Sequence, residues 1–228
     1  MRRELPLIRA ILFDFDGVLT TDKTGSVSTL RSLSQQTGIS EDLLWDAFAP
    51  FNEHLLSGRT THGAVWAKIC DRLGQDLDPA ILTRGFDSTP IRRDMLCFAA
   101  GLRRHYSTGI ITDNKADRMQ RLTELHSLAS IFNIIIVSAE HGSGKEQPSI
   151  FESAVESLCV APHECVFVDN SRRNLVAPAA LGMHTLYFND AIDTAQSLSD
   201  VLSERYGIVA PRVPPNNSFK PNPLRGSA

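Results

Sequence analysis

The chain has 228 residues, of which 42% are hydrophobic and 21% charged, as in an ordinary globular protein with enough apolar material for a core. Its formal net charge of −3 excludes the strongly basic surface that attracts nucleic acid in bulk. Pro6 and Arg9 interrupt the apolar core of any signal peptide, and no stretch approaches the ~18 apolar residues of a membrane helix. We therefore expect a cytoplasmic protein that binds neither nucleic acid nor membranes, and the sequence carries no signal for an oligomeric state.

The first predicted strand is the apolar run 11–13, and it ends at two carboxylates, Asp14 and Asp16, that lie one residue apart. In such a pattern one carboxylate can attack a phosphorus atom while the other handles the proton of the leaving oxygen. The alternative is a polar exit from a strand into a turn, because Asp and the following Gly17 are common turn residues. The pattern favours the catalytic interpretation.

Residues 21–89 contain no strong strand signal, but their apolar residues recur at helical spacing. One predicted helix face carries Leu44, Phe48, Phe51 and Leu55, and another carries Val65, Ile69 and Leu73. Ser40 and either Thr60 or Thr61 are plausible N-caps, since a hydroxyl can accept a hydrogen bond from a free backbone N–H of the first turn. We predict an all-helical insertion over this segment.

Four further apolar runs are predicted as strands: 109–111, 132–137, 166–168 and 185–188. Helical patterns begin near Ala116, Ser149, Asn174 and Ala191. Short buried strands that alternate with helices indicate an α/β fold, a doubly wound parallel sheet with helices on both faces. The core is then discontinuous, over 1–20 and 90–210, with a smaller all-helical domain over 21–89. The Pro- and Asn-rich tail 211–228 has no apolar periodicity and is expected to be disordered.

The four cysteines show no C-x-x-C spacing and lie within apolar patterns: Cys70, Cys97, Cys159 and Cys165. Zinc ligands and disulfides are therefore less expected than buried free thiols, since a free cysteine behaves as a small hydrophobic residue. We predict four buried free thiols.

Polar residues fall at or just beyond the ends of several predicted strands: Asp14, Thr112, Lys145 and Asp169. Ligands of parallel sheets bind at the carboxyl ends of the strands, so these four segments should form one site. In this order, with Asp16 and Asn170 beside them, the motifs resemble those of the haloacid dehalogenase superfamily of phosphohydrolases. The resemblance covers roughly residues 8–206 and implies a Rossmann-like core, with 21–89 as a helical cap over the site.

The resemblance implies a role for each matching residue. Asp14 would attack the phosphoryl group and form an aspartyl-phosphate, while Asp16 would protonate the leaving oxygen and then deprotonate the hydrolytic water. Thr112, Asp113 and Lys145 would bind the phosphate, and Lys145 would also balance the negative charge of Asp14 and the substrate.

The same resemblance implies a Mg²⁺ ion held by Asp14, the main-chain carbonyl of Asp16, Asp169 and Asn170. The family usually carries two adjacent carboxylates where this chain has Asp169 and Asn170. An amide oxygen can bind Mg²⁺ but contributes no charge, so we expect a lower metal affinity. Glu146 replaces the proline that usually follows the lysine, a change expected to alter only the loop.

The function that the resemblance implies is a Mg²⁺-dependent phosphatase of a small phosphorylated metabolite, of the sugar phosphate, phosphoglycolate or nucleotide class. Arg59 and His62 are candidates for substrate contacts from the cap. The alternative for both is a solvated turn, because they lie beside Gly58 between two helical patterns.

Other functions remain open. A 2-haloacid dehalogenase would also use Asp14 but needs neither a metal nor Asp16. A phosphomutase would share every motif, and a non-catalytic binding protein with a degenerate metal site is suggested by Asn170 alone. The segment 142–145 also invites a P-loop interpretation, which is rejected because Ala139 and Glu146 occupy positions that a P-loop needs as Gly and Ser or Thr.

Overall fold

A computed structural model describes residues 5–209, which form a five-stranded parallel sheet with helices on both faces. The strands are β1 (Ala10–Phe13), β2 (Ser107–Thr112), β3 (Ile134–Val137), β4 (Cys165–Asp169) and β5 (His184–Tyr187), in the spatial order β3-β2-β1-β4-β5. Every pair of neighbouring strands is parallel, and β1 is central between β2 and β4. The predicted fold class is confirmed, and all four residues of β1 are buried, as expected for a strand covered on both faces.

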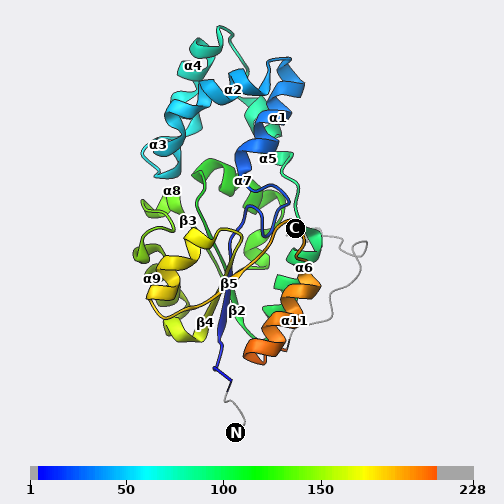
Figure 1. The fold of residues 1–228 in the computed structure, drawn as a ribbon. Coiled ribbons are helices and arrows are strands. Elements are labelled where there is room, and N and C mark those ends of the chain that lie inside the picture. The colour runs from blue at the N-terminus through cyan, green and yellow to red at the C-terminus, as the bar shows by residue number, and fades with distance from the viewer. Residues whose placement is uncertain (1–4, 210–228) are drawn as a thin grey trace, which may run out of the picture.

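The helices of the core divide between the two faces of the sheet (Figure 1). They are α6 (Arg93–Leu102), α7 (Ala116–Leu125), α8 (Ser138–His141), α9 (Pro148–Leu158), α10 (Val176–Ala180) and α11 (Ala195–Tyr206), with 3-10 turns η2 (Leu128–Ser130), η3 (Pro162–Glu164) and η4 (Arg172–Leu175) between them. One buried apolar cluster joins residues of α6, α7 and α11 to the sheet, and a second joins those of α9 and α10 to its other face. Both faces of the sheet are therefore covered by helices.

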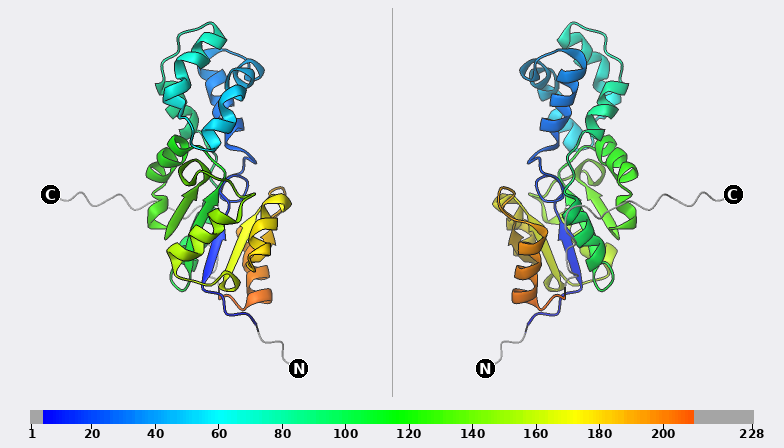
Figure 2. Two further views of the ribbon diagram at one scale, coloured as in Figure 1. Left: turned by 90° about the vertical axis from the view of Figure 1, so that its left-hand side faces the viewer. Right: turned by 90° about the vertical axis from the view of Figure 1, so that its right-hand side faces the viewer.

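The named elements between β1 and α6 are all helices: α1 (Gly25–Thr37), α2 (Glu41–Phe48), η1 (Ala49–Phe51), α3 (Asn52–Leu56), α4 (His62–Leu73) and α5 (Ala80–Asp87). We call these the inserted helices. They bury an apolar cluster of their own, which includes Leu33, Leu44 and Ile69. The side views of Figure 2 show them beyond one end of the sheet, and they are joined to the core by two chain segments.

The two connecting segments lie against each other. Thr20 and Ile91 form an antiparallel β-bridge, the N–H of Thr21 donates to the carbonyl of Pro90 at 2.9 Å, and the N–H of Arg92 donates to that of Leu19 at 2.9 Å. The chain therefore leaves the core and returns to it at adjacent points. The division into a core and a cap with the predicted boundaries stays a prediction, and the predicted tail lies outside the described residues.

The helix caps and faces largely follow the sequence pattern. The hydroxyls of Ser40 and Thr61 accept from the first turns of α2 and α4, so Thr61 and not Thr60 is the second N-cap. The helix predicted to carry Leu44, Phe48, Phe51 and Leu55 is divided into α2, η1 and α3, with Pro50 in η1. Leu44, Phe48 and Phe51 still pack in one apolar cluster, and Leu55 is buried.

The cysteines depart in part from the prediction. All four are free thiols, and Cys70 and Cys165 are buried as expected, but Cys97 is half-buried and Cys159 is exposed. Cys159 ends α9 with a left-handed backbone (φ 52°), which carries its side chain away from the apolar face of the helix. Within residues 5–209, no helix has the length and apolar character that crossing a membrane requires.

Candidate active site

The carboxyl ends of β1, β2 and β4 form the floor of a cleft that faces the inserted helices. In the sheet register Phe13 of β1 pairs with Val168 of β4, so Asp14 and Asp169 follow at the same level on neighbouring strands. The N–H of Asp14 donates to the carbonyl of Val168 at 2.8 Å, which fixes this arrangement. Parallel register thus places two acidic side chains next to each other.

Lys145 joins these two carboxylates. Its Nζ lies 2.7 Å from Oδ1 of Asp14 and 2.8 Å from Oδ2 of Asp169, and all three side chains are buried. The predicted convergence of these three residues in one cleft is therefore observed, although their catalytic roles stay predictions. Burial lowers the pKa of Lys145, but the negative charges of Asp14, Asp169 and Asp113 outweigh this effect and raise it above its ordinary value.

The loop that carries Lys145 is held by the residue after β2. Oδ1 of Asp113 accepts a hydrogen bond from the N–H of Lys145 at 2.9 Å. A Cβ atom at Gly144 would lie 2.9 Å from the same oxygen and 2.4 Å from Glu146, so glycine lets the loop approach this closely. Asp113 thus positions Lys145. Its contact with a phosphate stays a prediction. Thr112, also predicted to bind phosphate, is buried and lines the cleft.

Negative charge exceeds positive charge at the floor of the cleft. Asp14, Asp113 and Asp169 surround the single ammonium of Lys145. Burial is the main cause that raises the pKa of Asp14 to about 7; Lys145 lowers it, and the neighbouring Asp169 and Asp16 raise it further. Burial likewise raises the pKa of Asp113. A further positive charge would relieve this imbalance, so the cleft has the electrostatics of a cation site.

Asp16 is bound by an arginine that the sequence did not indicate. Nη1 and Nη2 of Arg118 lie 2.9 and 3.0 Å from the two carboxylate oxygens of Asp16, and Nδ2 of Asn114 donates to it at 2.9 Å. Arg118 is itself buried and also donates to Thr89 at 3.3 Å. Asp16 is therefore the counter-ion of Arg118, so to donate a proton it must first take one up and open one of these hydrogen bonds.

The guanidinium of Arg118 lies against the first residue of α1. A Cβ atom at Gly25 would come within 2.1 Å of Cζ of Arg118, so no larger residue fits there without displacing the guanidinium. Arg118 thus contacts both Asp16 of the core and the start of the inserted helices.

Asp169 and Asn170 lie differently in the site. The carboxylate of Asp169 is fully buried and accepts from Lys145, from the N–H of Ser171 at 2.7 Å and from Nδ2 of Asn174 at 3.2 Å. Asn170 lines the cleft instead, and its amide covers Gly17 so closely that a Cβ there would lie 2.0 Å from Nδ2. Of the two, Asn170 is the better placed to meet a ligand, and Asp169 holds Lys145.

The residues of the cleft fit a Mg²⁺ ion. Oδ2 of Asp14 accepts no hydrogen bond from residues 5–209, and Asn170, which has an amide oxygen, lines the same cleft. No group of three or more His, Cys, Asp or Glu side chains in that part of the chain could hold a metal alone. Mg²⁺ is usually bound by one or two carboxylates and keeps several waters, so the available oxygens are sufficient.

The two candidate substrate contacts on the inserted helices lie away from the cleft. Arg59 is exposed, and its Nη2 lies 2.6 Å from Oε1 of Glu53. His62 is buried, with Nδ1 2.8 Å from Oδ2 of Asp117 on α7, and it lines a second cavity next to the cleft. The geometry gives Arg59 no contact with the cleft.

Three residues around the cleft were not predicted: Asn114, Lys115 and Arg118. One sequence signal was available, because Lys115 and Arg118 place two cations at the start of α7, where the helix dipole disfavours positive charge. Because these two cations reduce the stability of the helix, their position indicates a role other than helix stabilisation. Their partner Asp16 is distant in the sequence, so the pairing itself had no local signal.

Burial, followed by the charge of Arg118, lowers the pKa of Lys115 to about 8, below its ordinary 10.5. Between these pH values the unfolded chain keeps a proton that the folded chain has lost, so this group makes the free energy of unfolding increase as pH rises from about 8 to 10.5. We expect a gain of about 3 kcal/mol over this window, relative to Lys115→Met. Urea titrations at pH 7 to 10 on both proteins measure it, and parallel pH curves would contradict it.

Comparison with known proteins gives a consistent result. The family model for haloacid dehalogenase-like hydrolases matches residues 8–182. The bifunctional epoxide hydrolase 2 of Rattus norvegicus is 26% identical over 223 residues, which cover 87% of this chain and 40% of the relative. The chain thus spans about two-fifths of that relative's length.

Solved structures share the fold. A haloacid dehalogenase family enzyme of Bacteroides thetaiotaomicron, solved with magnesium and inorganic phosphate, superposes with a TM-score of 0.67 at 19% identity, over 83% of this chain and 98% of that one. A 2-haloacid dehalogenase of Pseudomonas syringae pv. Tomato superposes with a TM-score of 0.63 at 19% identity, over 86% and 99% of the two chains. At these identities the likeness concerns the fold.

Proposed function

The chain belongs to the haloacid dehalogenase-like hydrolases, and from this premise we propose that it is a Mg²⁺-dependent phosphatase of a small phosphorylated metabolite. The observation that carries the proposal is the cleft floor, where Asp14 is paired with Lys145 and a second carboxylate, Asp16, lines the same cleft. The Bacteroides enzyme, which shares the fold, was crystallised with magnesium and phosphate, and this supports the choice.

Each residue of the cleft then has a defined task. Asp14 attacks phosphorus through a carboxylate oxygen, the bond to the ester oxygen breaks, and the departing alkoxide takes a proton from Asp16. In the second half Asp16 removes a proton from water, which attacks the aspartyl-phosphate and regenerates Asp14. Lys145 and Thr112 stabilise the oxygens of the phosphoryl group.

Mg²⁺ would be held by Asp14, the main-chain carbonyl of Asp16 and the amide of Asn170, with waters in the remaining positions. When bound, it would neutralise the charge of the phosphoryl group. The excess negative charge of the cleft supports this assignment, because the three carboxylates near Lys145 would otherwise repel an anionic substrate.

The rival function is dehalogenation, because a 2-haloacid dehalogenase shares the fold. A dehalogenase does not need Asp16 as a proton donor, so the presence of both Asp14 and Asp16 favours the phosphatase. The test is p-nitrophenyl phosphate with Mg²⁺ or with EDTA, in parallel with 2-chloropropionate and measurement of chloride. We expect phosphate release that requires Mg²⁺. Chloride release that persists in EDTA, without phosphate release, would overturn the proposal.

The place of Asn170 leads to a second prediction. Asn170→Asp keeps the shape of the side chain and supplies an anionic oxygen to the proposed Mg²⁺ site, where hard cations prefer charge. We expect half-maximal phosphate release at a Mg²⁺ concentration about tenfold or more below that of the wild type. Magnesium titrations at saturating ester measure this, with Asn174→Asp, which alters a partner of Asp169, as the matched control. Equal Mg²⁺ requirements for wild type and Asn170→Asp would rule out metal contact by Asn170.

A further inference from the structure

A second cavity lies between the inserted helices and α7. Its volume is about 120 Å³, and it opens to solvent. Its walls come from α1, α2, η1, α3, α4, α5 and α7. Most of their surface is hydrocarbon: Leu30, Trp45, Phe48, Leu55 and Phe86. We call it the apolar cavity.

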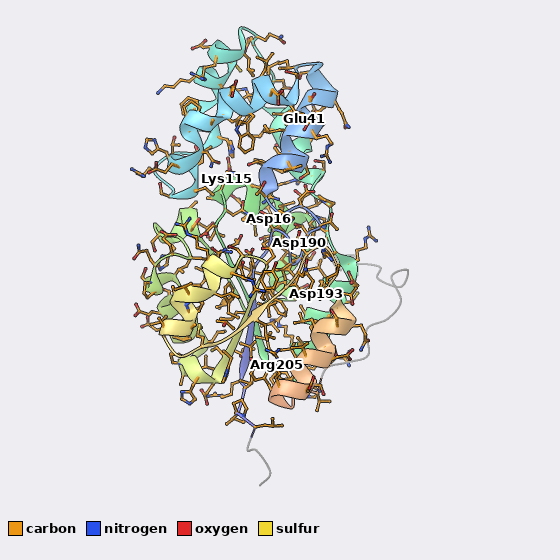
Figure 3. The ribbon with its side chains drawn as sticks, in the orientation of Figure 1. Asp16, Glu41, Lys115, Asp190, Asp193 and Arg205 are labelled. Carbon is orange, nitrogen blue, oxygen red and sulfur yellow. The ribbon has the colours of Figure 1, made fainter. Side chains whose placement is uncertain are left out.

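The apolar cavity is continuous with the catalytic cleft. Both are lined by Gly25, Ser26, Trp45, Asn52 and Lys115. Figure 3 shows Lys115 on the side of Asp16 that faces the inserted helices. A ligand whose phosphate lies at Asp14 can therefore extend into this space past the residues that line both.

Several polar groups in the wall of the apolar cavity already have partners, while Nε of Arg118 has none among the described residues. Nζ of Lys115 lies 3.2 Å from Oγ of Ser26, and Nδ1 of His62 lies 2.8 Å from Asp117. The guanidinium of Arg118 is bound to Asp16. A sugar in this space would have to exchange its hydration for few free donors and acceptors, which is unfavourable, whereas a hydrocarbon group needs none.

Trp45 lies where the two spaces meet. Its relative exposure is 54%, high for a large aromatic side chain, and it lines both the cleft and the apolar cavity. An aromatic ring at this point offers apolar contact to a group that passes from one space to the other.

We propose that the apolar cavity binds the organic part of the substrate, and that this substrate is a phosphate monoester of an apolar alcohol. The proposal rests on the phosphatase function and replaces the polar metabolites expected from the sequence. Phe48 and Phe86 contact the hydrocarbon group, the phosphate lies at Asp14, and Trp45 lines the passage between them.

A chain-length series tests this. The substrates are ethyl, butyl, hexyl and octyl phosphate, with glucose 6-phosphate and phosphoglycolate as polar esters, all with Mg²⁺. Each methylene that enters the cavity should raise kcat/KM about threefold to fourfold until the cavity is filled. A flat series, or a polar ester hydrolysed with higher kcat/KM than the octyl ester, would overturn the proposal.

Variants assign the effect to the cavity. Ala49→Phe fills it from η1, and Trp45→Ala removes an apolar wall at an exposed position that the fold tolerates. Either change should lower the octyl-to-ethyl ratio of kcat/KM by about tenfold. Leu43→Ala is the matched control, because Leu43 is an equally exposed apolar residue of α2 that lines neither the cleft nor the apolar cavity. An unchanged ratio in both cavity variants would refute the assignment.

A binding experiment separates the two proposals. Octylphosphonate cannot be hydrolysed, and calorimetry compares its affinity with that of ethylphosphonate. If no ester releases phosphate, the phosphatase function fails, and octylphosphonate that binds at least tenfold more tightly still supports the cavity assignment. If phosphate is released and the two phosphonates bind equally, the phosphatase function stands and the apolar substrate class is wrong.

Discussion

Asp14→Asn should abolish phosphate release, with no turnover above background for any ester. A carboxamide is a poor nucleophile, so the aspartyl-phosphate cannot form, while the shape of the side chain is kept. The fold should persist, because the change removes one of three negative charges around Lys145, whose Nζ also lies 2.8 Å from Asp169. Rapid-quench phosphorylation and steady-state phosphate assays measure the loss, and circular dichroism monitors the fold.

Asp113→Asn is the control for Asp14→Asn, since it also removes a charge near Lys145 but leaves the proposed nucleophile in place. We expect it to retain turnover. Covalent phosphate in Asp14→Asn would show that another residue is the nucleophile.

Asp16→Asn should lower kcat by about 10²–10⁴, the usual contribution of a general acid or base. The loss should depend on the leaving group: large for octyl phosphate, whose alkoxide must be protonated, and small for p-nitrophenyl phosphate, whose phenolate departs unaided. Comparison of kcat for these two esters in the wild type and in Asp16→Asn measures this. Equal losses on both esters would contradict the role of proton donor.

The same substitution leaves Arg118 buried without its counter-ion, so Asp16→Asn should also lower the free energy of unfolding by about 3–5 kcal/mol. The double variant Asp16→Asn/Arg118→Met separates stability from chemistry. We expect it to regain stability in urea titrations but not kcat for octyl phosphate. Recovery of both would mean that Asp16 acts only by holding Arg118.

The sequence predicts the fold and the site best where a local residue pattern defines a strand and a polar residue lies at its end. Short apolar runs that alternate with helices predict the sheet, and strand ends locate Asp14, Thr112 and Asp169 because parallel strands place their carboxyl ends on one edge. Lys145 was also expected just beyond a strand end, and α8 separates it from the end of β3. These expectations depend on patterns among residues that are close in the sequence, and a single sequence contains such patterns.

The rest depends on contacts between distant segments. The partnership of Asp16 with Arg118 joins residues 102 positions apart. The apolar cavity is assembled from six α-helices and η1, so neither feature has a local sequence pattern. Arg59 was a candidate for a substrate contact from the cap, but its Nη2 lies 2.6 Å from Oε1 of Glu53 instead. Side-chain partners of this kind are decided by packing.

The paired segments that connect the inserted helices to the core have an evolutionary consequence. Because Thr21 and Pro90 are hydrogen-bonded neighbours, the chain between them leaves the core and returns to it at one place. A change in the length or identity of the inserted helices leaves the order of the strands unaltered, as in proteins that tolerate an inserted domain. If the proposed function holds, reaction and selectivity can therefore diverge separately, because the proposed catalytic residues lie in the core and most walls of the apolar cavity lie in the inserted helices.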